Sequence, residues 1–247
     1  MINDWTTELD EANCVGIRVL FADFSKAFDK MSHPLLLQRQ CDLKVNPGLV
    51  EMTSNFLSCR KQAVTNYRSK PAAESEYKNL DCGVPQGSIL GPWLWITYAN
   101  SIGDDFDGVT SQKYADDTTC YQPLFKNDIE IEMKRESEDR YVEPATDKDH
   151  LQDSFSALEK WSDRSNMALN EKKTSFMFIT KRLNLESTLF FNNGSTVAQT
   201  DCQRVLGVLI DRHLNFKQHV LSIVKKIKPR LYWLKVSKLV VWMKHHL

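Results

Sequence analysis

Three aspartates, one alone and two adjacent, are the residues of this 247-residue chain best suited to catalysis. Asp23 directly follows the apolar run VGIRVLFA at residues 15–22, and Asp116 and Asp117 separate two β-prone runs within residues 111–124. The first run is typical of a buried central strand, and the second segment of a hairpin, although its tip is not the common Asn-Gly type. If the two strands are neighbours in one sheet, the three carboxylates meet at its edge.

Such a group of carboxylates predicts a site for divalent metal ions. Mg²⁺ prefers hard oxygen ligands and keeps some positions for water and phosphate. Two ions about 4 Å apart can activate an attacking 3′-hydroxyl and stabilise a leaving pyrophosphate, which is the chemistry of nucleotidyl transfer. The simpler alternative is that Asp23 caps a helix, while Asp116 and Asp117 are turn residues of an exposed hairpin.

The other expected elements must hold these aspartates in place. Helical character begins at Ser25, with Pro34 either in a first turn or between two helices. Residues 126–150 are polar without clear periodicity, which favours a solvated insertion. The further expected elements are helices at 47–60, 88–102 and 151–167, a hairpin at 62–80, a loop at 83–88, strands at 174–180 and 204–211, and a basic amphipathic helical region at 216–242 interrupted at Pro229.

The composition is that of an ordinary globular protein, with 32 basic and 32 acidic side chains and a formal net charge of 0. The charges are nevertheless segregated: residues 204–247 carry ten Lys or Arg and one acid (+9), whereas residues 128–159 carry eleven acids and four bases (−7). No signal peptide or apolar run of roughly 18 residues is present. We therefore expect an intracellular soluble protein, nuclear or cytoplasmic, without a membrane partner. Six isolated cysteines without a C-x-x-C pair argue against a zinc or redox site.

Five segments of the chain also resemble a known family when they are taken in order. They are FADFSKAFDKMSHPLLL, GVPQGSILGP, KYADDTTCY, LNEKKTSFMFI and RVLGVLID. In this order they resemble motifs A to E of reverse transcriptases. Group II intron and telomerase enzymes share the two-aspartate motif. The amino-acid sequences of the first two segments are, however, more similar to those of reverse transcriptases from non-LTR retrotransposons of the LINE or jockey-like group.

The resemblance extends from about Trp5 to His219 and implies a fold. We expect an α/β (α+β) protein: a right-hand polymerase palm whose antiparallel sheet packs on helices, with partial fingers and a partial thumb. Residues 1–203 would form the palm with a remnant of the fingers, and residues 204–247 the primer-grip hairpin and the start of the thumb.

The resemblance assigns catalytic roles to the residues that match its motifs. Asp23 and Asp116 would bind metal, with two Mg²⁺ ions expected and Mn²⁺ as a substitute. Asp117 would support them, and the Phe24 carbonyl would be a further ligand. Lys173 would serve the pyrophosphate as proton donor or counter-charge. Because Lys172 is adjacent, a merely solvated lysine is the alternative at this position.

The resemblance also assigns residues to substrate binding. Phe28 would lie under the incoming sugar and exclude a 2′-hydroxyl, and Gln86 and Gly87 would touch the incoming nucleotide and the template, where glycine permits close backbone approach. The alternatives are a core aromatic for Phe28 and an ordinary turn before a helix for Gln86 and Gly87.

The function that the resemblance implies is an RNA-directed DNA polymerase that adds deoxynucleotides to a primer 3′-hydroxyl. Its partners would be an RNA template, a DNA primer and deoxynucleoside triphosphates. Most of the family's fingers segment, its endonuclease domain and its further thumb sequence have no counterpart here, so we expect a truncated polymerase. The alternatives are a catalytically inactive nucleic-acid-binding remnant and an unstable product of a decaying copy. A partner-protein helix would share the basic pattern of residues 216–242.

Overall fold

The computed structural model describes residues 1–68, 73–133, 140–144, 149–181 and 185–246. A five-stranded sheet forms its centre, in the order β12-β10-β1-β7-β6, and is antiparallel except for the β10–β12 pair. Its strands are β1 (Cys14–Ala22), β6 (Thr110–Tyr114), β7 (Asp117–Phe125), β10 (Ser175–Ile179) and β12 (Ala198–Gln199).

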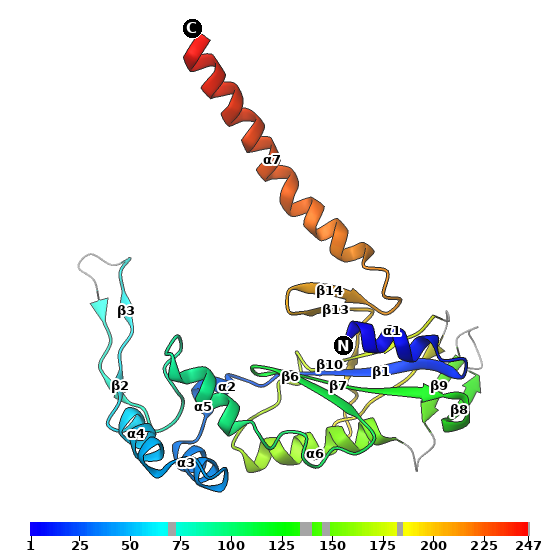
Figure 1. Cartoon of the computed structure of the whole chain (residues 1–247), viewed down its shortest axis with the longest axis horizontal. Coiled ribbons are helices and arrows are strands. Elements are labelled where there is room, and N and C mark those ends of the chain that lie inside the picture. Colours follow the sequence, from blue (N-terminus) through cyan, green and yellow to red (C-terminus); the bar gives the residue numbers. More distant parts are fainter. Residues whose placement is uncertain (69–72, 134–139, 145–148, 182–184, 247) are drawn as a thin grey trace.

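The central strand β1 is covered on both faces. Eight of its nine residues are buried, which explains why its sequence is continuously apolar rather than alternating. Leu20 and Ala22 belong to the larger core, which also contains buried residues of α5 (Leu90–Tyr98) and α6 (His150–Arg164). Ile17 and Val19 face the second core, on the side of α1 (Ile2–Asp10). Helices α1 and α6 therefore lie on opposite faces of the sheet (Figure 1).

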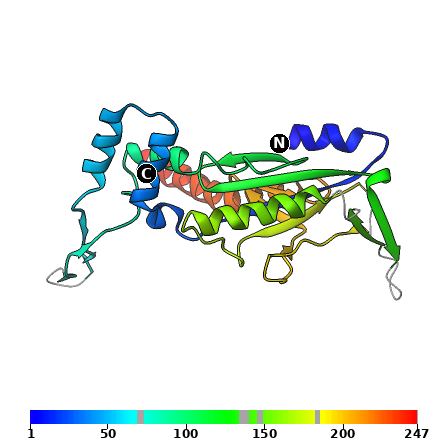
Figure 2. The same cartoon turned by 90° about the horizontal axis from the view of Figure 1, so that it is seen from below.

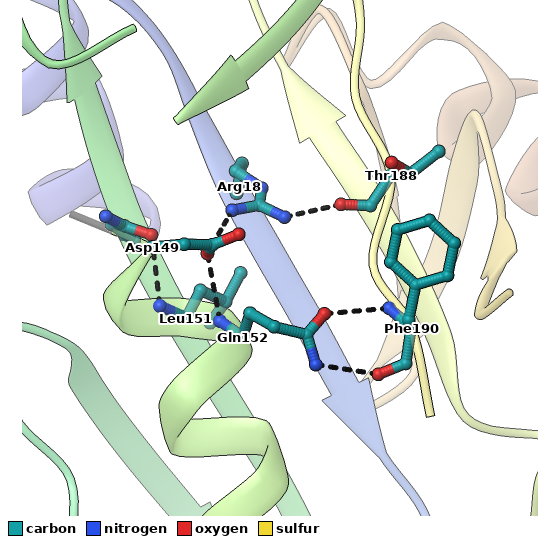
Figure 3. Close-up of polar contacts among 7 residues, drawn as sticks. Arg18, Asp149, Leu151, Gln152, Thr188 and Phe190 are labelled. Carbon is teal, nitrogen blue, oxygen red and sulfur yellow. Dashed lines mark hydrogen bonds and ion pairs between the residues drawn. The ribbon is translucent and has the colours of Figure 1, made fainter. Parts of the chain in front are cut away.

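A polar network ties β1 to α6 and to the segment before β12 (Figure 3). The Arg18 guanidinium is fully buried, forms a 2.5 Å ion pair with Asp149 and donates to the Thr188 carbonyl. Asp149 also accepts from the Gln152 backbone amide at 3.0 Å and so caps α6. The Gln152 side chain completes the link by bonding both backbone groups of Phe190.

A helical lobe carries a protruding hairpin at one end of the sheet (Figure 1). Pro34 lies in the first turn of its helix and Pro47 in that of the next, where a missing amide hydrogen costs little. The first-turn position, one of the two alternatives for Pro34, is thus confirmed, and the preceding helix ends before the helix of Pro34 begins. The elements are α2 (Ala27–Lys30), α3 (His33–Asp42), α4 (Pro47–Leu57), β2 (Lys61–Gln62), β3 (Thr65–Asn66), β4 (Ala73–Glu74) and β5 (Lys78–Asn79).

The prediction for residues 126–150 was incomplete. After the short helix η1 (Lys126–Asp128), β8 (Ile129–Met133) pairs antiparallel with β9 (Arg140–Pro144), and β9 pairs with β11 (Leu185–Glu186). The alternation IEIEM is a strand pattern of only five residues, and it is easily lost in a charged segment.

The C-terminal elements are a hairpin and one long helix, which projects from the body in Figure 1 and lies behind it in the view from below in Figure 2. The predicted strand at 204–211 is two strands, β13 (Cys202–Val205) and β14 (Val208–Asp211), which reverse at Leu206 and Gly207 with positive φ angles of 48° and 88°. The predicted interruption at Pro229 is wrong, because α7 (Lys217–His246) continues through this residue. A proline removes a single helical hydrogen bond, and water can solvate the freed carbonyl of an exposed helix.

Within the described ranges, every helix is too short or too polar to span a bilayer.

Candidate active site

The pairing of β1 with β7 brings two of the three predicted aspartates together. Ala22 pairs with Thr118, so Asp23, just after β1, lies beside Asp117, the first residue of β7. The two strands are thus neighbours, and the condition for bringing these aspartates together is met. Asp116 lies one residue earlier, in the turn of the β6–β7 hairpin.

The tip of this hairpin is held by the side chain of Trp95, a role that the sequence did not reveal. Tyr114 pairs with Asp117, which leaves Ala115 and Asp116 as the turn, and Ala115 has a positive φ of 53°. The indole nitrogen of Trp95, a buried residue of α5, donates to the Ala115 carbonyl at 2.5 Å. Trp95 packs in the larger hydrophobic core, as a buried tryptophan usually does. Only its contact with the turn shows that it also fixes the acidic tip.

Asp23 is anchored through its backbone, while its carboxylate stays unsatisfied. Its carbonyl accepts from Asn170 at 2.8 Å, and its amide lies 3.4 Å from the Thr174 hydroxyl. The carboxylate oxygen Oδ2 is buried and has no hydrogen-bond partner, and its neighbour is the Lys173 ammonium at 3.4 Å. A buried carboxylate oxygen without a hydrogen bond is costly unless a cation compensates it.

The three carboxylates influence one another electrostatically. Burial raises the pKa of Asp117, and the negative charges of Asp116 and Asp23 raise it further, while Lys173 opposes the shift. Like charges within a few ångströms favour the protonated form of a carboxyl group. The ionised form of Asp117 is therefore disfavoured by its acidic neighbours, and a cation bound among the three carboxylates would relieve this repulsion.

The carboxylates of this site are of the chemical type that binds divalent cations. Their arrangement does not, however, form a complete set of metal ligands. Among the described residues, no three histidine, cysteine, aspartate or glutamate side chains gather closely enough to hold a metal ion. The unsatisfied oxygen of Asp23 and the adjacent Asp117 nevertheless offer the hard carboxylate donors that Mg²⁺ prefers.

These groups open into a cleft of about 430 Å³. Asp23, Asp117, Lys172 and Lys173 line one part of it, and β13 contributes residues 203–205. Asp116 is not among the lining residues. The cleft thus joins the end of the central sheet to the C-terminal hairpin, which belongs to the segment where the basic residues of the chain are concentrated.

The residues expected to bind the nucleotide lie apart from this cleft. Phe28 is half-buried with its ring 5.4 Å from that of Trp95, and the Phe24 side chain is buried in the core. Gln86 donates to Asp29 at 3.0 Å and lines a second cleft of about 480 Å³. Gly87 has a φ of +78° and open space beside its Cα, so its backbone is exposed.

The loop that carries Gln86 is docked tightly against α2. Gly83 has a φ of +78°, and a Cβ there would lie 2.6 Å from the backbone oxygen of Asp29. Its amide donates to Met31 and that of Val84 to Phe28, at 2.8 and 2.9 Å. The loop is therefore more than an ordinary turn, because glycine is required for its contact with the helix.

Comparison with known proteins gives one family. Residues 10–210 match the family described as "Reverse transcriptase (RNA-dependent DNA polymerase)". The "RNA-directed DNA polymerase from mobile element jockey" of Drosophila funebris is 29% identical over 218 residues, which cover 85% of this chain and 21% of that protein. The "Probable RNA-directed DNA polymerase from transposon X-element" of Drosophila melanogaster is 27% identical over 226 residues, covering 89% and 22%. The chain thus spans about a fifth of these relatives.

Solved structures with the same fold include telomerases of Candida tropicalis. The apo enzyme truncated from its C-terminal domain superimposes with a TM-score of 0.53 at 12% identity, over 87% of this chain and 38% of that one. The complex with the TWJ fragment of telomeric RNA gives the same TM-score and identity, over 87% and 32%. At this identity the likeness shows the fold alone, and it confirms the predicted palm with an antiparallel sheet packed on helices.

Proposed function

This chain belongs to the reverse transcriptase (RNA-dependent DNA polymerase) family, and we propose from this premise that it adds deoxynucleotides to a primer 3′-hydroxyl on an RNA template. The observation that carries the proposal is the strand register that sets Asp23 beside Asp117 in a cleft shared with β13. Its relatives in Drosophila are named as polymerases of mobile elements of the jockey and X-element kind. The family generally uses divalent metal ions.

Asp23 and Asp116 are the proposed metal ligands, with Asp117 in support and the Phe24 carbonyl as a further ligand. Two Mg²⁺ ions, when bound, would activate the attacking hydroxyl and stabilise the charge of the leaving pyrophosphate. The protein's own contribution is the fixed backbone around Asp23 and the turn held by Trp95. The backbone at both aspartates is thereby held by rigid elements, which would keep reacting groups in register.

Other residues of the chain would orient the nucleotide and its leaving group. Phe28 is proposed to exclude a 2′-hydroxyl, and its packing on Trp95 would keep the ring rigid enough to do so. Gln86 and Gly87 are proposed to contact the nucleotide and template, and Gly87 offers an open backbone for this. Lys173 is proposed to neutralise or protonate the pyrophosphate.

The C-terminal elements are proposed to hold the primer strand. Residues 203–205 of β13 line the same cleft as Asp23, and Arg204 adds a cation there. Beyond the hairpin, α7 stands clear of the body, so its lysines can reach duplex phosphates. Residues 1–203 would then be the palm with a remnant of the fingers, and 204–247 the primer grip and start of the thumb.

Primer extension tests this proposal. The purified chain is incubated with a DNA primer on an RNA template, deoxynucleotides and Mg²⁺, and the variants Asp23→Asn and Asp116→Asn are compared with Asp104→Asn, a loop carboxylate outside the cleft. We expect incorporation to be abolished in the first two and retained in the third. Unchanged incorporation by Asp23→Asn or Asp116→Asn rules out the proposed site.

A second candidate is nucleic-acid binding without catalysis, favoured by the exposed basic helix α7. Its described part from residue 217 to 233 is exposed along nearly its whole length and carries no acidic residue. Binding to an RNA–DNA duplex would weaken steeply with salt, because each phosphate contact releases counterions. Duplex binding without incorporation supports this candidate. Retention of full affinity after deletion of residues 217–247 excludes α7 as its basis.

A further inference from the structure

Lys173 forms an ion pair with the same carboxylate that is proposed to bind metal. We propose that its ammonium group is a built-in counter-ion that competes with the divalent cation for Asp23 and thereby sets the affinity of the site for metal. This inference rests on the proposed function for Asp23. It gives Lys173 a role toward the metal ion that is separate from any role toward pyrophosphate.

The geometry places the ammonium on the oxygen that most needs a cation. Lys173 Nζ lies 3.4 Å from Asp23 Oδ2, the buried oxygen that has no hydrogen-bond partner. An ammonium beside this oxygen compensates part of the cost of burying it. A metal ion that takes the same oxygen as a ligand must displace the ammonium, because two cations on one oxygen repel each other.

The pair is arranged so that the lysine can leave at little cost. The Lys173 side chain is 66% exposed, whereas that of Asp23 is 25% exposed. Released from the carboxylate, the ammonium returns to water and stays fully hydrated. Ion pairs of this exposed kind contribute little to stability, so the lysine can act as a replaceable cation.

The lysine also stays within reach when it leaves. The Lys173 amide donates to the Asn170 carbonyl at 3.0 Å, and the Asn170 amide donates to the Asp23 carbonyl at 2.8 Å. The turn that carries the lysine is thus fastened to the backbone of its carboxylate partner. Such tethering keeps the local concentration of the competing ammonium high.

Lys172 provides a matched comparison. It lines the same cleft, and among the described residues it forms no ion pair. Removing either lysine takes one positive charge from the cleft, so any difference between the two variants reports the pair with Asp23 rather than the general field. Because an exposed pair is weak, we expect Lys173→Gln to lower the dissociation constant for a divalent cation roughly two- to fivefold.

The test measures Mn²⁺ binding to the full chain without nucleic acid, by electron paramagnetic resonance of the free ion. The variants are Lys173→Gln, Lys172→Gln, Lys173→Arg and Asp23→Asn, each checked for cooperative thermal unfolding. We expect Lys173→Gln to bind Mn²⁺ more tightly than the unmodified chain and than Lys172→Gln. Lys173→Arg, which keeps the charge, should bind nearly as the unmodified chain does.

The outcomes separate this inference from the proposed function. If Asp23→Asn weakens Mn²⁺ binding but Lys173→Gln binds no more tightly than Lys172→Gln, the competition is wrong and the metal site stands. If Asp23→Asn leaves Mn²⁺ binding unchanged, Asp23 is not a ligand and both proposals fail. The competition is supported if Lys173→Gln is the only lysine variant that binds Mn²⁺ more tightly, while Lys173→Arg binds it nearly as the unmodified chain does.

Discussion

Replacement of Asp149 by asparagine should destabilise the fold although the side chain is nearly unchanged in shape. Asp149 pairs with the fully buried Arg18 and caps α6 through the Gln152 amide. Asparagine is as good a helix cap as aspartate, so this substitution removes only the negative charge. Arg18 is then left buried with neutral partners.

The magnitude follows from the burial of the two partners. Breaking a buried ion pair from one side typically costs about 3–5 kcal/mol. The lower end applies here, because the Asp149 side chain is 23% exposed and an amide oxygen can still accept from Arg18. We expect a loss of about 3 kcal/mol for Asp149→Asn, and about 1 kcal/mol more for Asp149→Ala, which also loses the cap.

Urea denaturation followed by circular dichroism measures these losses. Arg18→Met removes the buried charge itself, so the double variant with Asp149→Asn should lose clearly less than the sum of the two single variants. A loss under about 0.5 kcal/mol for Asp149→Asn would refute the reasoning, since changes of that size are ordinary for surface substitutions. Strict additivity in the double variant would refute it as well.

Three further perturbations test the site and its supports. Gly83→Ala should destabilise by about 1–3 kcal/mol more than Gly194→Ala in urea denaturation, because both have positive φ but only at residue 83 would a Cβ meet backbone, at 2.6 Å; equal losses would contradict the close contact. Asp117→Asn should raise the melting temperature at pH 7. Burial and the neighbouring acids raise the pKa of Asp117 above its ordinary value of 3.8, so the unfolded chain ionises first and stability falls as pH rises from about that value through the folded pKa. The gain should vanish near pH 3, and a gain that persists there would be inconsistent with this linkage. Trp95→Phe removes the bond to the Ala115 carbonyl and should lower primer extension at least about tenfold for a loss of only about 1–2 kcal/mol of stability; unimpaired extension would show that the turn needs no such support.

Local sequence patterns were enough to predict several elements of the fold. The apolar run before Asp23 predicted a central strand, and the two short β-prone runs on either side of the aspartate pair predicted a hairpin, as the structure has them. Proline in a first turn and a glycine-rich loop are likewise local features. Where the local pattern was short or misleading, the sequence failed, as it did for the β8–β9 hairpin and for the continuity of α7 through Pro229.

The contacts between these elements depend on tertiary packing and could not be predicted from local patterns. The register of β1 against β7, which sets Asp23 beside Asp117, depends on packing both faces of the sheet at once. A one-residue slip would turn every buried side chain to the wrong face. The bond from Trp95 to the turn depends on the packing of α5. The pairing of Lys173 rather than Lys172 with Asp23 occurs in the turn before β10, the other neighbour of β1. Contacts between residues so far apart in the chain have no local signal, because they are fixed by the packing of the whole core.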